Sequence, residues 1–211
     1  MGDMNFLLKK LGNRTLDGVC AFIRNRRGVA MAEFAMLLPL LMLLAGGSFE
    51  IGRYALIMQK LDRISATLSD LIARSETEAI TETEISNIID SALYLAEPFD
   101  FSGNTMVILT SVQGRLSEAP EILSQRVSGS IPGGHSAVGD TVGGDATLPA
   151  AFPDAGDGQT LADGETLIVA EVIYNYSPFL LGSLGVLKNH VIYRDAYFRP
   201  RFTDTITFPS S

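Results

Sequence analysis

The sequence predicts an α+β protein. A long N-terminal helix, first transmembrane and then amphipathic, precedes a small domain with a second helix and three to four antiparallel strands. Three observations support this: residues 29–51 form an apolar stretch, residues 52–74 keep apolar side chains at three- and four-residue steps, and β-branched residues gather in later segments. These patterns are typical of a membrane span, an amphipathic helix and strands, respectively.

The apolar stretch is long enough to cross a bilayer. Residues 29–51 make about 34 Å of helix at roughly 1.5 Å per residue, and a bilayer core is about 30 Å thick. Pro39 removes one helical hydrogen bond, and Gly46 and Gly47 loosen the middle, so we expect a bend here. The acid near its start, Glu33, costs roughly 2.5–3.5 kcal/mol in a bilayer, which suggests a partner or a function.

The amphipathic extension, residues 52–74, predicts that the same helix continues beyond the membrane. A break follows, and Ser75 and Thr81 each precede a glutamate by three residues, so either can start a capping box. Apolar side chains at Ile85, Ile88 and Ile89 mark one face of a second helix, which ends before Pro98.

The exported domain is predicted at residues 75–208, and its part after the second helix is predicted to consist mainly of strands. Residues 105–112, 165–176 and 190–199 are rich in β-branched and aromatic residues. Residues 121–127 alternate and predict either the hairpin partner of the first strand or a helix. Between the segments 121–127 and 165–176, at about residues 128–164, the composition shifts to Gly, Pro, Asp, Ala and Ser. This composition predicts a flexible surface loop.

The sequence has no clear pattern of catalytic or cofactor-binding residues, and we expect neither catalysis nor a bound cofactor. His135 and His190 lack metal-ligand spacing, the single cysteine, Cys20, precedes the apolar stretch, and Gly143-Gly144 does not join a strand to a helix. The acids of the loop are either calcium ligands or part of a solvated surface. They are Asp140, Asp145, Asp154, Asp157 and Asp163.

Charge is distributed unevenly along the chain. The first 28 residues hold six basic and two acidic side chains, a net of +4, whereas the whole chain carries −8. Basic residues before an apolar span place residues 1–28 in the cytoplasm and the domain in the periplasm, as a single-pass protein of the inner membrane. The acidic domain argues against nucleic acid as a partner.

Three fates of the N-terminal segment are possible. A secretory signal peptide would be cut before Ser48, where small residues precede it, and a signal anchor would stay uncut. The third possibility is cleavage between Gly28 and Val29, which accounts together for the basic leader, the glycine and the acid five residues later.

The residues resemble the TadE/TadG-like family, minor pseudopilins of the tight-adherence (Flp) type IV pilus machinery. Three stretches carry the resemblance. The first is Arg-Gly-Val-Ala-Met-Ala-Glu-Phe-Ala at 27–35 with Leu-Leu-Pro-Leu-Leu at 37–41 and Phe-Glu-Ile-Gly-Arg at 49–53. The second is Val-Ala-Glu-Val-Ile-Tyr-Asn-Tyr-Ser-Pro at 169–178, and the third is Arg-Pro-Arg at 199–201.

The resemblance implies a non-catalytic protein that primes or caps a pilus and has a pilin-like domain. A prepilin peptidase would cut after Gly28, and Glu33, beside Phe34, would meet the new amino terminus of a neighbouring subunit. The implied partners are that peptidase, other pilins or pseudopilins, the inner-membrane platform proteins and the lipid bilayer. The opposing hypothesis is a secreted or signal-anchored adhesin or envelope-binding domain, for which the first helix is only a tether.

Overall fold

The computed structural model describes residues 26–99, 101, 103–116, 118–149, 161–183, 185 and 187–209. Most of the predicted leader, Cys20 included, lies outside the described residues. The chain divides into two compact units, Met1–Phe49 and Glu50–Ser211.

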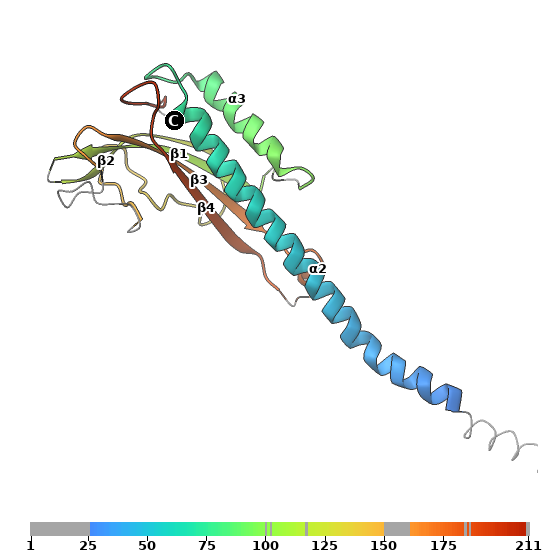
Figure 1. Ribbon diagram of the computed structural model, residues 1–211. Helices are drawn as coiled ribbons and strands as arrows, with labels where there is room; N and C mark the ends of the chain where they lie inside the picture. The colour runs from blue at the N-terminus through green and yellow to red at the C-terminus, as the bar shows by residue number, and fades with distance from the viewer. Residues whose placement is uncertain are drawn as a thin grey trace, which may run out of the picture. The chain divides into compact units, whose positions relative to one another are not determined.

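The predicted α+β class is confirmed (Figure 1). The helices are α2 (Arg26–Ala73), α3 (Glu82–Leu93) and the short α4 (Leu180–Ser183), with a 3₁₀ turn η1 (Tyr94–Ala96) after α3. The strands are β1 (Thr105–Arg115), β2 (Glu118–Gly129), β3 (Thr166–Tyr176) and β4 (His190–Phe198). Because residues 121–127 lie inside β2, the helical alternative for this segment is wrong.

The first unit contains the N-terminal turns of α2. Side chains are exposed throughout residues 28–45 and at 48 and 49, and they include nearly all the large apolar residues of this stretch. The helix continues through Pro39 without a break. The bend predicted at Pro39, Gly46 and Gly47 stays a prediction.

The second unit is built on one antiparallel sheet with the strand order β2-β1-β3-β4. The central strand β3 is buried at ten of its eleven residues. Alternate side chains of a strand point to opposite faces, so burial along the whole strand requires cover on both faces of the sheet.

Helices cover one face. The second half of α2 lies along the sheet, and α3 lies beside the C-terminal turns of α2 (Figure 1). Ile57, Leu61, Ile64, Leu68 and Ile72 are fully buried and recur at three- and four-residue steps. They share a core with side chains from α3 and from β1, β3 and β4. Of the two candidate caps, Thr81 caps α3 by accepting from the Glu84 amide at 3.3 Å.

The described part of the loop 130–149, together with Leu161, covers the other face. Val138, Ala146 and Leu161 are buried against Leu167 and Val169 of β3, although the sequence shows no periodic apolar pattern there. The loop is therefore a packed layer in its described part, held by isolated apolar side chains. The flexibility predicted for residues 128–164 stays a prediction, and residues 150–160 of this loop lie outside the described residues.

Candidate functional site

The predicted processing and assembly residues lie on the first turns of α2. Gly28, Val29, Glu33 and Phe34 are all exposed, with Val29 at 55% and Phe34 at 58%. A Cβ at Gly28 would meet nothing within 4 Å. Glycine in a helix costs roughly 0.5–1 kcal/mol relative to alanine, so no contact among the described residues explains a glycine here.

A buried carboxylate, Glu50, forms a polar site in the second unit where α2 meets the connection between β3 and β4. Glu50, 3% exposed, accepts hydrogen bonds from the Phe179 amide through Oε1 and from the Leu180 amide through Oε2, each at 3.0 Å. Its Oε1 also accepts from the Tyr176 hydroxyl. We call Glu50, Arg53, Tyr176, Phe179 and Leu180 the Glu50 cluster.

Arg53 completes this cluster one helical turn after Glu50. Its Nη1 lies 3.6 Å from Glu50 Oε1 and donates to the Ser177 carbonyl at 3.0 Å. The guanidinium also lies over three aromatic rings, 5.4 Å from the centroid of Tyr176, 5.9 Å from Phe99 and 6.0 Å from Phe179. The charge of Glu50 is therefore compensated by a cation and by three donors, as a buried carboxylate requires.

Tyr176, a member of the Glu50 cluster, is buried and also packs against two further rings. The ring of Tyr54 meets it edge-on at 5.3 Å, and His190 lies 5.1 Å away. Burial, followed by the hydrogen bond to Glu50, raises the pKa of Tyr176 to about 12. The hydroxyl therefore remains a proton donor over the whole physiological pH range.

Further polar contacts tie α2 to the domain along its second half. Lys60 Nζ donates to the Leu95 carbonyl at 2.8 Å, and Asp62 pairs with Arg194 at 2.7 Å. Near the end of α2, Asp70 accepts from Arg201 at 2.7 Å. All three stretches that suggested the family therefore contribute to contacts between α2 and the domain: 49–53 with 169–178 at the Glu50 cluster, and 199–201 at Asp70.

Comparison with known proteins supports the resemblance. Residues 28–67 match the family model for TadE-like proteins, and the match begins at Gly28. This segment is therefore similar to TadE-like proteins. No curated protein and no solved structure matches the chain. The TadE-like segment suggests involvement in the Tad pilus machinery, as expected from the sequence.

The TadE-like segment spans two environments. It contains the exposed turns with Gly28 and Glu33 and, beyond Phe49, two members of the Glu50 cluster, Glu50 and Arg53, and the first buried apolar side chains of the second half of α2. Among the helices in the described part of the chain, one, Gly28–Ala73, is long and apolar enough to cross a membrane. This property is consistent with a single-pass anchor in a pilus system.

Sequence reasoning missed the role of Glu50 and Arg53. It placed Glu50 inside the predicted span, residues 29–51, and used Arg53 only as part of the family resemblance at residues 49–53. A signal was nevertheless present, because an acid and a base three residues apart lie at the end of the apolar stretch and face one another on a helix. Their partners around Tyr176 lie more than 120 residues away, and only the fold brings them together.

A second buried acid, Glu171, holds the loop layer. Its side chain is fully buried and accepts from the Ser136 hydroxyl at 2.6 Å, the Ala137 amide at 2.7 Å and the Tyr193 hydroxyl at 2.7 Å. Burial and this bond to Glu171 raise the pKa of Tyr193. The side chain lies on the face of β3 opposite to α2, so it stabilises the domain away from the Glu50 cluster.

The loop acids are dispersed in structural contacts. Asp140 accepts from the Ser136 amide at 3.0 Å, Asp145 pairs with Arg115, and Asp163 accepts from the Leu116 amide at 3.1 Å. Asp154 and Asp157 lie outside the described residues. Among the residues the structure describes, no group of three or more His, Cys, Asp or Glu side chains could hold a metal ion.

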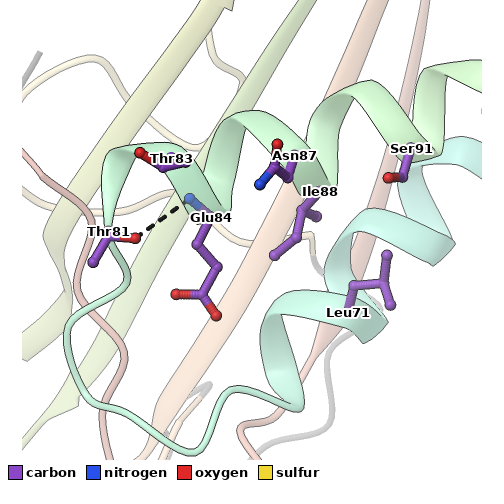
Figure 2. Close-up of a pocket in the computed structure, with 7 residues that line it drawn as sticks. All are labelled: Leu71, Thr81, Thr83, Glu84, Asn87, Ile88 and Ser91. Atoms are coloured by element: carbon purple, nitrogen blue, oxygen red, sulfur yellow. Dashed lines mark hydrogen bonds between the residues drawn. The ribbon is translucent and has the colours of Figure 1, made fainter.

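A shallow hollow of about 570 Å³ lies between α2 and α3 (Figure 2). Its walls are Leu71, Thr81, Thr83, Glu84, Asn87, Ile88 and Ser91. The Thr81 hydroxyl in its wall already accepts from the Glu84 amide (Figure 2). Because its walls mix apolar side chains with short uncharged polar ones and a single acid, Glu84, the hollow indicates no particular ligand.

Proposed function

We propose that this chain is a membrane-anchored, pseudopilin-like subunit that primes or caps a Tad (Flp) type IV pilus and has no catalytic activity of its own. The observation that carries the proposal is the TadE-like match over residues 28–67, which starts at the glycine of the predicted cleavage point. The same residues hold the exposed apolar turns and the acid Glu33.

The exposed apolar turns support a membrane location. Large apolar side chains exposed all around a helix are stable only in an apolar medium or against other apolar surfaces. Residues 28–49 make about 33 Å of helix, close to the thickness of a bilayer core. With the basic leader in the cytoplasm, the second unit would lie in the periplasm of a cell with an inner membrane.

The position of Gly28 supports processing by a prepilin peptidase. Glycine is an unfavourable helix residue, and among the described residues no neighbour of Gly28 lies so close that a side chain would not fit. Recognition by another protein is a reason to keep it. Cleavage would remove residues 1–28, including six basic side chains, and leave Val29 with a free, positively charged amine.

Glu33 then has a natural partner in another subunit. In an apolar medium, an ion pair is strongly favoured over two isolated charges, so the carboxylate would fix how two helices align. Phe34, which is exposed beside it, would add apolar contact to the same interface. The partners of this interface would be other pilins or pseudopilins, and the platform proteins of the inner membrane would receive the subunit.

Replacing Glu33 tests this proposal. We expect Glu33→Leu to insert into the membrane at least as well as the native chain, because the cost of the acid vanishes. Pilus assembly should nevertheless fail, while Glu33→Asp should keep part of it. Met36→Leu, a change at a neighbouring exposed position, is the control and should assemble normally. Membrane fractionation and recovery of sheared pili measure both steps.

Normal pili from Glu33→Leu cells would contradict the proposed role of the acid. Full adhesion by cells that make no pili would favour the opposing hypothesis, an anchored adhesin whose helix is only a tether.

A further inference from the structure

The connection between β3 and β4 presents apolar side chains to the outside beside the Glu50 cluster. Phe179 is 65% exposed and Leu187 is 44% exposed. Both line a hollow of about 470 Å³. We call it the β3–β4 hollow, and its walls are Arg53, Ser177, Pro178, Phe179, Gly182, Leu187 and Asn189.

The backbone at Phe179 is fixed rather than free to turn inward. Its amide donates to Glu50, as does the next amide, and Pro178 precedes it. Phe179 is therefore held in a position where most of its ring is exposed. An apolar ring kept outside by hydrogen bonds to a buried carboxylate suggests a surface that has an apolar partner.

The location of this surface indicates the partner. Its anchor, Glu50, directly follows the exposed apolar turns 28–49 in the sequence, and under the proposed function these turns cross the bilayer. The residues bonded to Glu50 then lie where the helix leaves the bilayer, at the level of the lipid headgroups.

The chemistry of the surface suits that level. Aromatic side chains are enriched at membrane–water interfaces, where an apolar ring meets the acyl boundary while polar groups stay hydrated. Arg53 lies within 6.0 Å of the Phe179 ring, and the exposed Lys188 follows Leu187. Cations beside apolar side chains match the phosphate groups of phospholipids.

We propose that Phe179 and Leu187 form an interfacial contact with the phospholipid bilayer, with Arg53 and Lys188 facing the headgroups. The contact gives the second unit a second attachment to the membrane beside its helix. Such an attachment would limit rotation of the domain and hold it at a fixed height above the bilayer. The inference rests on the proposed membrane anchoring, but not on processing or on a role in the pilus.

The test uses the absence of tryptophan from the chain. Three single-tryptophan variants of the full chain, Phe179→Trp, Leu40→Trp and Phe202→Trp, are reconstituted in phosphatidylcholine–phosphatidylglycerol vesicles with or without bromine on the acyl chains. Phe202 is the matched control. It is 66% exposed and adjoins Arg201, which binds Asp70, about 25 Å further along α2 than Arg53.

We expect Trp emission from the Leu40→Trp and Phe179→Trp variants to lose much of its intensity in brominated vesicles, and that from Phe202→Trp to stay unchanged. Quenching at position 40 without quenching at 179 would overturn the lipid contact and leave the anchor intact. A lack of quenching at position 40 would overturn the anchor and with it this inference. If the emission of the Phe179→Trp variant indicates a buried tryptophan only at high protein concentration and does not respond to bromine, the surface binds a second copy of the chain. The proposed lipid contact would then be wrong.

Discussion

The two halves of α2 have similar apolar side chains and opposite surroundings. Leu40 in the first half is 54% exposed, whereas Leu68 in the second half is fully buried. In residues 28–49 apolar side chains occupy all sides of the helix, but from Ile57 onward they form one stripe that faces the sheet. The comparison teaches that the second half is part of its own domain, while the first half requires an environment from outside the described chain.

The acids of the two halves differ in the same way. Glu50 is buried and has three hydrogen-bond donors within its own unit, and Glu33 is exposed. One acid therefore organises the subunit itself, and the other is available to a different molecule. Loss of either should have effects that can be separated by experiment.

The largest expected difference between the halves is the loss in free energy of unfolding when a leucine is replaced by alanine. Leu68→Ala leaves a cavity in the core between α2 and the sheet and should lower the free energy of unfolding by about 2–5 kcal/mol. Leu40→Ala, at an exposed position, should leave it nearly unchanged. Thermal or urea unfolding of the full chain in detergent micelles measures both. Equal effects would mean that the second half is not packed on its own domain.

A smaller difference is expected between the two acids. Glu50→Gln loses the ionic character of four contacts and should destabilise the second unit by about 1–3 kcal/mol. Glu33→Gln is the matched control and should leave unfolding unchanged while impairing assembly. If Glu50→Gln unfolds like the native chain, the Glu50 cluster does not stabilise the domain.

The smallest expected effect belongs to Tyr176 and appears at alkaline pH. Tyr176→Phe removes one hydrogen bond and should cost about 1 kcal/mol near neutral pH. A tyrosine in the unfolded chain ionises near pH 10, whereas Tyr176 in the folded protein keeps its proton to about pH 12. The unfolded state therefore binds fewer protons between these values, and the stability that Tyr176 contributes is lost as the pH rises through them.

Comparing the native chain with Tyr176→Phe at increasing pH checks this dependence, since the effects of Tyr193 and Tyr197 cancel in the difference. The gap in unfolding free energy should shrink above pH 10. A gap that stays constant up to pH 12 would show that the Tyr176 hydroxyl does not titrate with a raised pKa.

Local patterns predicted most of the fold. The helices and strands follow from apolar spacing and from β-branched segments, because these patterns depend on neighbouring residues only. The packing of the loop layer was not predictable in this way. Val138 and Ala146 are isolated apolar residues among glycines and polar residues, and only the face of β3 opposite to α2 gives them a place to pack.

The candidate site was predictable in part. The positions of Gly28 and Glu33 follow from their spacing and from the family resemblance, and their roles stay predictions. The Glu50 cluster was not predicted, since Glu50 and Tyr176 are 126 residues apart and neither local sequence requires the other. A buried acid at the end of an apolar stretch is a signal that its partner lies elsewhere in the chain.

The central claim is that the first half of α2 is a processed membrane segment that acts between subunits. The most direct measurement is the first residue of the mature chain, determined by N-terminal sequencing of protein purified from its native membrane. Our account predicts Val29. A mature chain that starts at Met1, as for an uncut anchor, or at Ser48, as for a secreted protein, would contradict it.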